Sequence, residues 1–326
     1  MKVLIADKFQ DQGVRALRDA GCEVLVQPGL KDGSLTEAIR QTECHVLVVR
    51  STKVTADQLR ASPQLEMVIR AGSGVDTIDV EAASARGIKV TNCPGKNSVA
   101  VAELTIGLMI ALDRQIVDET DDLRRGVWNK KGYSQARGLK GRTLGIVGLG
   151  RIGYEVAQRA KAFEMRLVYT DVVAHAEFER ALGLNRMELK ELLREADFVT
   201  LHVPGGSDTR HLIGEGELSM MKPTAFVINC SRGGVVDETA LAKAVATGVI
   251  AGAALDVYEM EPSATDTEFR DPVTQAPHVY GTHHVGASTE QAQDAVAEEV
   301  VKIILTYLET GRVINGVNLS AIASPA

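Results

Sequence analysis

The chain has 326 residues, of which 45% are hydrophobic, and its formal net charge is -7. This length predicts about two domains, and the apolar content is sufficient for a large buried core. The acidic balance disfavours non-specific binding to nucleic acid, and no apolar run reaches the roughly 18 residues of a membrane span.

The N-terminal sequence MKVLIAD turns polar after a few apolar residues, which is typical of a first strand and not of a signal peptide. The four cysteines have no CxxC spacing, and neither HExxH nor a cluster of His and Cys at ligand spacing occurs. We therefore expect reduced thiols, a cytoplasmic protein and no metal site. The cysteines are Cys22, Cys44, Cys93 and Cys230.

In the first 97 residues, short runs rich in Val and Ile alternate with amphipathic stretches. We predict buried parallel strands at 2–7, 23–27, 45–50, 65–71 and 89–93. One of the helices between them is predicted to begin at Ser34, because Glu37 three residues later completes a capping box. Such alternation predicts a parallel sheet that is covered by helices on both faces.

From Ser98 the pattern changes to one long apolar helix, predicted over 98–116, which could be a domain connector, a subunit interface or both. A last helix is predicted from near Ser288, with Gln291 completing a capping box, to about Thr310. Between these helices, six further strands are predicted at 143–150, 166–171, 197–204, 225–232, 251–259 and the apolar end of 278–284.

The expected fold class is α/β, with two doubly wound parallel-sheet domains. A Rossmann nucleotide-binding domain over 98–286 is inserted in a flavodoxin-like substrate domain that comprises 1–97 plus 287–326. The chain would then cross between the domains twice, and we expect a cleft between them.

The stretch GLGRIG, residues 148–153, fits the dinucleotide-binding pattern GxGxxG between an apolar strand and an amphipathic helix. Gly148 would allow the tight turn, Gly150 the approach of a pyrophosphate, and Gly153 close packing of helix and strand. The next strand ends in Asp171, where a carboxylate would bind the ribose hydroxyls and repel the extra phosphate of NADP. The predicted cofactor is therefore NAD.

Polar residues follow three later strands, at the edge where ligands of such sheets bind. They are Arg232, a group of acids at Asp256, Glu259 and Glu261, and the adjacent His283 and His284. A guanidinium can hold a carboxylate in two hydrogen bonds, and a histidine beside a buried carboxylate can transfer a proton. If the segment is extended, the two histidines point to opposite faces, so that one faces the site and the other faces away.

The stretches VGLGRIG, NCSRGGVVDE, AALDVYEMEP and HHVGAST, in this order, resemble the D-isomer-specific 2-hydroxyacid dehydrogenases. VVRSTKVTAD (48–57), RAGSGVDTID (70–79) and NSVAVAELTIGLMIAL (97–112) are similar to the 3-phosphoglycerate dehydrogenase branch of that family. The resemblance extends from residue 2 to about residue 318. It implies a short form without C-terminal regulatory domains, active as a homodimer through the nucleotide-binding domain.

The resemblance implies that Arg232 binds the substrate, that His284 donates the proton, and that Glu261 orients His284 while Glu259 has no part in the reaction. His283 stands where relatives commonly have Pro, and the resemblance gives it no catalytic role. The positions that match NAD contacts are Ser73, Gly148, Gly150, Arg151, Ile152, Gly153, Asp171, His202, Val203, Pro204, Cys230, Ser231, Asp256 and Gly286. The positions that match substrate contacts are Arg50, Ser51, Lys53, Arg70, Ser73 and Gly74.

The expected reaction is oxidation of D-3-phosphoglycerate to 3-phosphohydroxypyruvate, a step of serine biosynthesis. Arg50, Lys53 and Arg70 lie at strand ends and suit a phosphate, which carries about two negative charges. The alternatives are a reductase of glyoxylate, hydroxypyruvate or another 2-ketoacid, a non-catalytic NAD-sensing corepressor, and a formate dehydrogenase. The stretch 128–141 and the long loop between Glu261 and His284 depart from the branch's usual pattern.

Overall fold

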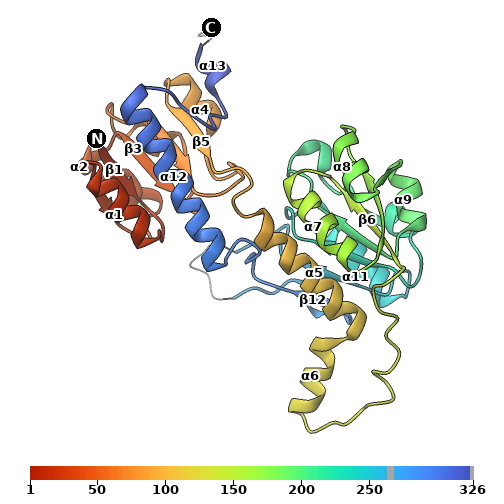
Figure 1. Cartoon of the computed structure of the whole chain (residues 1–326). Coiled ribbons are helices and arrows are strands. Elements are labelled where there is room, and N and C mark those ends of the chain that lie inside the picture. The colour runs from red at the N-terminus through yellow and green to blue at the C-terminus, as the bar shows by residue number, and fades with distance from the viewer. Residues whose placement is uncertain (263–267, 324–326) are drawn as a thin grey trace. The chain divides into compact units, whose positions relative to one another are not determined.

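The computed structural model describes residues 1–262 and 268–323. The chain divides into two compact units. Unit 1 comprises Met1–Asn97 with Ser288–Ala326, and unit 2 comprises Ser98–Ala287. Each unit has its own parallel sheet with helices on both faces, which confirms the predicted α/β class (Figure 1).

The sheet of unit 1 has the strand order β2-β1-β3-β4-β5, and all its pairs are parallel. This is the flavodoxin-like order. The central strand β3 is fully buried, because parallel strands covered on both faces need apolar side chains on both. The strands are β1 (Lys2–Ile5), β2 (Glu23–Val26), β3 (Val46–Val49), β4 (Met67–Arg70) and β5 (Lys89–Asn92).

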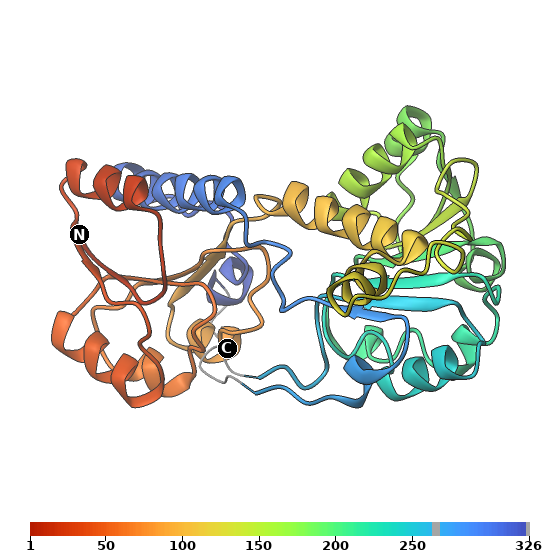
Figure 2. The same ribbon diagram turned by 90° about the horizontal axis from the view of Figure 1, so that it is seen from below.

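Helices α1 (Asp11–Asp19) and α12 (Glu290–Thr310) lie side by side in unit 1 (Figures 1 and 2). They pack on one core, which includes Val3, Ile5 and Ile303. A second core contains Leu4, Leu47 and Leu59 beneath the remaining helices of the unit. Those helices are α2 (Asp32–Thr42), α3 (Ala56–Arg60) and α4 (Val80–Ala85), and α13 (Leu319–Ala323) contacts α4.

The sheet of unit 2 has the order β12-β11-β10-β9-β6-β7-β8, in which the strand order reverses beside β6. It contains one strand more than the six predicted. The additional strand, β8, has two exposed residues and, within the described part of the unit, pairs with β7 alone, so it leaves no apolar run in the sequence. The strands are β6 (Thr143–Val147), β7 (Arg166–Thr170), β8 (Asn185–Arg186), β9 (Phe198–Leu201), β10 (Phe226–Asn229), β11 (Gly252–Leu255) and β12 (Val279–Gly281).

Two cores flank this sheet. One includes Met109, Val156 and Tyr169, on the side of α5 and α7, and the other includes Leu192, Leu218 and Leu241, on the side of α9, α10 and α11. The helices are α5 (Ser98–Arg114), α6 (Ile116–Arg124), α7 (Arg151–Ala162), α8 (Ala176–Leu182), α9 (Leu189–Glu195), α10 (Glu215–Leu218) and α11 (Glu238–Ala246), with short 3-10 turns η1 (Ser207–Thr209) and η2 (Pro272–Gln275).

The predicted helix over 98–116 is two helices. Helix α5 ends at Arg114, Gln115 adopts a left-handed backbone with φ 53°, and α6 then extends away from the sheet of unit 2 (Figure 1). Helix α5 packs against α7, and its buried residues include Ala102, Met109 and Leu112. Burial in the core of unit 2 therefore accounts for its apolar character.

Both predicted capping boxes are wrong in detail. Helix α2 begins at Asp32, and the Ser34 hydroxyl accepts a hydrogen bond from the Lys31 N–H at 2.9 Å, inside the first turn. Helix α12 begins at Glu290, where the Thr289 hydroxyl accepts from the Ala292 N–H at 3.1 Å. Its end at Thr310 agrees with the prediction. Among the described residues, no helix has both the length and the apolar composition that a membrane span requires.

Candidate active site and cofactor site

The glycine-rich turn after β6 has the geometry that a dinucleotide needs. Gly148 has φ 89°, and a Cβ there would lie 2.7 Å from the His202 carbonyl oxygen. A Cβ on Gly153 would lie 2.3 Å from the Gly148 carbonyl oxygen, so the first turn of α7 packs directly on the loop. Gly150 instead faces open space within 4 Å, which leaves its backbone accessible to a phosphate at the N-terminus of α7.

Asp171 lies immediately beyond β7 and is joined to the glycine turn. Its Oδ2 accepts a hydrogen bond from the Leu149 N–H at 2.6 Å, and its Oδ1 accepts from the Val173 N–H at 3.1 Å. The carboxylate is therefore held beside the turn, where it can accept from the ribose hydroxyls of NAD. The residues of this region fit NAD, with Arg151 and Ile152 opening helix α7.

The other predicted contacts of unit 2 also follow strands. His202, Val203 and Pro204 come after β9, and His202 has both ring nitrogens buried without a hydrogen-bond partner in the described chain. Burial lowers the pKa of His202 to about 3, so its ring is neutral at physiological pH. Cys230 and Ser231 follow β10 and are buried, and burial raises the pKa of the Cys230 thiol to about 12.

Asp256, directly after β11, is buried and bound to the segment that carries the histidines. Its Oδ1 accepts from the Thr282 hydroxyl at 2.6 Å and from the Val285 N–H at 2.8 Å. Its Oδ2 accepts from the Gly286 N–H at 2.9 Å. Asp256 thus fixes the backbone on both sides of His284, a role that the sequence does not reveal because the partners are up to 30 positions away.

The structure brings His284 and Glu261 together. His284 Nδ1 lies 2.8 Å from Glu261 Oε2, and Glu261 Oε1 accepts from the Tyr258 N–H at 3.0 Å. Burial by itself would raise the pKa of Glu261, but the hydrogen bond and charge of His284, the Tyr258 N–H and the charge of Arg232 together lower it below its usual value. An ionised Glu261 can orient the imidazole and leave Nε2 to exchange a proton with a ligand.

The expectation that the two histidines lie on an extended segment is wrong. Strand β12 ends at Gly281, and His284 has a left-handed backbone with φ 51°. His211 and His278 adopt the same conformation, which histidine shows more often than most residues, so the conformation alone does not mark His284 as functional. Glu261 was also expected to be buried, yet its side chain is 33% exposed. His283 is exposed and has no side-chain hydrogen bond within the described residues.

Arg232 follows β10 in a rigid turn. The side chain of Asn229 donates to the Arg232 carbonyl oxygen at 3.0 Å, and Arg232 Nη1 donates to the Ser231 carbonyl oxygen at 2.8 Å. A Cβ on Gly233 would lie only 1.8 Å from the Tyr258 carbonyl oxygen, so this turn packs against the one that leads to Glu261. A pocket of about 260 Å³ adjoins the turn and is lined by Gly205, Gly206, Ser207, Thr209, Arg210, Gly233, Gly234 and Val235.

Glu259 has structural partners that the sequence does not indicate. Its Oε2 lies 3.1 Å from His211 Nε2, and its Oε1 accepts a hydrogen bond from Arg210. These hydrogen bonds, from His211 first and then Arg210, lower the pKa of Glu259. Glu259 therefore ties the loop after β11 to the loop after β9.

In unit 1, the predicted substrate residues gather after two neighbouring strands. Arg50, Ser51 and Lys53 follow β3, and Arg70 ends β4, which pairs with β3. Asp7 holds the first of these loops, because its Oδ2 accepts from the N–H groups of Arg50, Ser51 and Thr52 at 2.6, 3.1 and 3.1 Å. The Arg50 guanidinium also donates to the Ser288 hydroxyl at 3.3 Å.

The loop after β4 is held by its own set of contacts. The Ser73 hydroxyl donates to Asn97 Oδ1 at 2.6 Å, and the Asn92 amide donates to the Ser73 carbonyl oxygen at 2.5 Å. The guanidinium of Arg70 lies directly on Gly72, where a Cβ would be 1.5 Å from Nη1. Ser73 and Gly74, whose backbone is predicted to bind the carboxylate, directly follow Gly72 in the chain.

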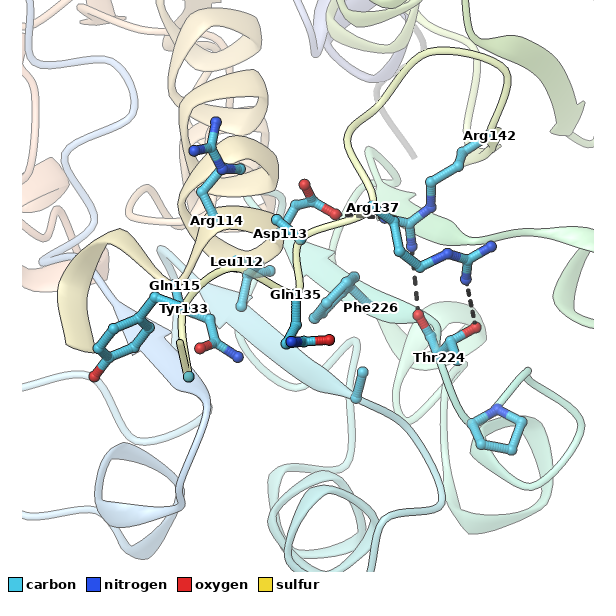
Figure 3. A pocket seen from close by; sticks show the side chains of 14 residues that line it. Leu112, Asp113, Arg114, Gln115, Tyr133, Gln135, Arg137, Arg142, Thr224 and Phe226 are labelled. Atoms are coloured by element: carbon cyan, nitrogen blue, oxygen red, sulfur yellow. Dashed lines mark hydrogen bonds and ion pairs between the residues drawn. The ribbon is translucent and has the colours of Figure 1, made fainter. Parts of the chain in front are cut away.

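Another pocket of unit 2, of about 210 Å³, contains none of the predicted site residues (Figure 3). Arg142 at its wall is buried and binds Asp113 at 2.7 Å, and Arg137 donates to the Thr224 hydroxyl at 3.0 Å. Burial lowers the pKa of Arg142, while the charge of Asp113 opposes that effect. These contacts fasten the segment before β6 to the sheet.

Residues 106–286 match the family described as D-isomer specific 2-hydroxyacid dehydrogenase, NAD binding domain. The D-3-phosphoglycerate dehydrogenase of Methanocaldococcus jannaschii is 44% identical over 310 residues, which are 93% of this chain and 57% of that relative. The chain thus spans little more than half the length of that relative. The glyoxylate reductase of Thermococcus litoralis is 41% identical over 84% of this chain and 83% of its own length.

Solved structures have the same fold. A crystal structure of a Thermus thermophilus protein matches with a TM-score of 0.87 and 34% identity, over 97% of this chain and all of that one. Together with the geometry of the glycine turn and Asp171, these similarities show that the chain belongs to the D-isomer specific 2-hydroxyacid dehydrogenase family and contains its NAD-binding domain.

Proposed function

We propose that the protein is an NAD-dependent D-2-hydroxyacid dehydrogenase that oxidises D-3-phosphoglycerate to 3-phosphohydroxypyruvate. The observation that carries the reaction class is the contact of 2.8 Å between His284 Nδ1 and Glu261 Oε2, in the unit that contains the NAD-binding domain. The sequence identity of 44% to the D-3-phosphoglycerate dehydrogenase of Methanocaldococcus jannaschii supports D-3-phosphoglycerate as the substrate.

Each residue has a distinct chemical task in this proposal. When bound, NAD supplies the carbon that exchanges a hydride with C2 of the substrate. Arg232 holds the carboxylate and polarises the oxygen on C2, for which a planar guanidinium is suited. His284 accepts the hydroxyl proton during oxidation and returns it during reduction, while Glu261 keeps the ring oriented. Oxidation should therefore become faster as the pH rises.

The side chains at the ends of β3 and β4, and not the backbone of the loop after β3, support a phosphorylated substrate. Its backbone N–H groups from Arg50 to Thr52 are already bound to Asp7, so they are not available to a phosphate. Recognition would depend on the side chains of Arg50 and Lys53, and on Arg70 at the end of the adjacent strand. Three cations at neighbouring strand ends suit a group with about two negative charges.

The direct test is a panel of 2-keto acids with NADH, followed by absorbance, that includes 3-phosphohydroxypyruvate, hydroxypyruvate and glyoxylate. His284→Ala should lower kcat about 10²- to 10⁴-fold, the range of general acid-base catalysis, and leave NADH binding unchanged. Near-normal turnover by this variant would refute the assignment of His284. Formate with NAD belongs in the same panel, because formate-dependent NADH formation would favour a formate dehydrogenase.

The phosphate proposal has a separate test. Arg50→Ala and Lys53→Ala should lower kcat/KM for 3-phosphohydroxypyruvate at least about tenfold more than for hydroxypyruvate, because a charge-assisted hydrogen bond is worth about 1.5–3 kcal/mol. Arg60→Ala is the matched control, because Arg60 pairs with Asp57 on α3 and is exposed. Equal losses on both substrates would remove the phosphate role.

One other substrate is supported by a specific observation. The glyoxylate reductase of Thermococcus litoralis aligns over 83% of its own length, a larger share than for the phosphoglycerate dehydrogenases. A reductase of glyoxylate or hydroxypyruvate would show the higher kcat/KM on the unphosphorylated acid, and Arg50→Ala would then have little effect.

We also propose a homodimer that forms through unit 2. Helix α6 and the residues after it expose apolar side chains, with Leu123 58% and Trp128 79% exposed. Large exposed apolar side chains of this kind are enriched at subunit interfaces. Light scattering should give twice the mass of the chain, and Trp128→Ala should shift the equilibrium towards the monomer. A monomer at micromolar concentration would contradict this assembly.

A further inference from the structure

The loop from Asp256 to Pro262, which carries Glu261, is anchored by a glutamate outside the predicted catalytic set. Glu238, the first residue of α11, is 8% exposed, and its Oε1 accepts a hydrogen bond from the Glu259 N–H at 2.6 Å. No part of the predicted chemistry uses this carboxylate.

The contact fixes the backbone just before Glu261. The consecutive N–H groups of Tyr258 and Glu259 are bound by different carboxylates, the first by Glu261 at 3.0 Å and the second by Glu238. On its other side, the Tyr258 carbonyl leaves no room for a Cβ on Gly233, the residue after Arg232. The turn is therefore confined between Glu238 and the Arg232 loop, so loss of Glu238 would let it shift.

We propose that Glu238 is a positioning residue for the Glu261–His284 pair and acts through the N–H of Glu259. This inference rests on the proposed dehydrogenase function, because it concerns the geometry of the same proton-transfer pair. The side chain of Glu259 anchors the loop independently, through His211 and Arg210. Glu238 acts on the backbone of the loop, which leads directly to Glu261.

The surroundings of Glu238 add a pH dependence. Burial raises the pKa of Glu238 to about 7; the hydrogen bond from the Glu259 N–H opposes this rise, and the negative charges of Asp271, Glu259 and Glu261 add to it. Beside these acids lie His284, whose Nδ1 is 2.8 Å from Glu261, and Arg210 and His211, which are paired with Glu259; Asp237 lies 3.9 Å from His211. Both forms of Glu238 can accept from the Glu259 N–H, but the ionised form adds a negative charge near Glu261.

Three variants of Glu238 distinguish the effect of its hydrogen bond to the Glu259 N–H from the effect of its negative charge. Glu238→Gln keeps an oxygen at the same distance and cannot ionise, so its kcat should stay within about threefold of the unchanged enzyme. Glu238→Asp keeps the charge but is one methylene too short, and Glu238→Ala has no acceptor. Both should lower kcat about tenfold or more, with the KM for NADH within about twofold, because a displacement of about 1 Å can cost up to 10²-fold. In Glu238→Gln, the contribution of a group with pKa about 7 to the pH profile of kcat should be absent.

The outcomes are distinguishable. If the unchanged enzyme reduces a 2-keto acid and Glu238→Asp is as active as Glu238→Gln, the positioning role is wrong and the dehydrogenase function stands. If Glu238→Gln is as impaired as Glu238→Ala, charge or packing matters and the hydrogen bond does not, which also overturns the inference. An unchanged enzyme without activity on any member of the panel would overturn the proposed function and this inference together. NADH binding and circular dichroism identify a variant that fails to fold. If Glu238→Ala does not fold, the comparison of kcat between Glu238→Asp and Glu238→Gln tests the positioning role.

Discussion

Glu238→Gln should stabilise the protein at pH 8 and have little effect at pH 5. The pKa of Glu238 rises from 4.5 to about 7, mainly through burial. An acid whose folded pKa exceeds its unfolded value holds an extra proton in the folded state, so the free energy of unfolding falls as pH rises between these values. At about 1.4 kcal/mol for each pH unit, the difference between 4.5 and about 7 amounts to about 3 kcal/mol of stability lost by pH 8.

Glutamine cannot ionise, so the variant should not lose this stability. Urea denaturation followed by circular dichroism at pH 5 and pH 8 measures the difference between the two proteins. Glu177→Gln is the control, because Glu177 is exposed on α8 of the same unit, and its effect should be within about 0.5 kcal/mol at both pH values. If Glu238→Gln shows no larger gain at pH 8 than at pH 5, ionisation of Glu238 costs the fold nothing and the reasoning fails.

Three further predictions concern single contacts. His283→Pro should keep kcat/KM within about threefold of the unchanged enzyme in the NADH assay, because His283 is exposed and its N–H makes no hydrogen bond within the described chain. A loss of kcat/KM comparable to that of His284→Ala would contradict this prediction. Asp171→Asn keeps an acceptor for the Leu149 N–H but removes the charge, so the ratio of kcat/KM for NADH over NADPH should fall about tenfold, and an unchanged ratio would contradict the role of the charge. Asp7→Ala releases the N–H groups of the loop after β3 and should raise the KM for 3-phosphohydroxypyruvate about tenfold, with the KM for NADH unchanged. If the variant and the unchanged enzyme had the same KM for 3-phosphohydroxypyruvate, the loop would need no such anchor.

The central strands of both sheets could be predicted because parallel strands covered on both faces must be continuously apolar. Runs such as 45–50 therefore appear in the sequence, and β3 occupies Val46–Val49. Strand β8 could not be predicted, since its two residues are exposed at the sheet edge. The break at Gln115 was missed for another reason. Ile116 and Val117 resume the apolar character after Asp113 and Arg114, so the sequence reads as one helix, whereas the left-handed backbone of Gln115 ends α5.

The positions of the candidate site follow from the sequence because polar residues after parallel strands share one edge of the sheet. The contacts that orient them join residues far apart in the chain, and no local pattern encodes such a contact. Asp256 receives hydrogen bonds from Thr282, Val285 and Gly286, and Glu259 binds Arg210 and His211. The spacing of the strands in the sequence indicates which side chains lie near the carboxyl edge of the sheet. Hydrogen bonds between residues distant in the chain show which of these side chains hold the loops in place.

The choice between His283 and His284 illustrates this difference. Alternation along an extended strand would separate the two side chains, but the strand ends at Gly281 and the backbone of His284 is left-handed. What distinguishes His284 is its partner, Glu261, and the hydrogen bonds of Asp256 to Thr282, Val285 and Gly286 around it. An unfavourable backbone conformation persists only where surrounding contacts impose it. The hydrogen bonds that Asp256 accepts from the residues around His284 therefore account for its conformation, and the proton transfer proposed for His284 would use the geometry that they impose.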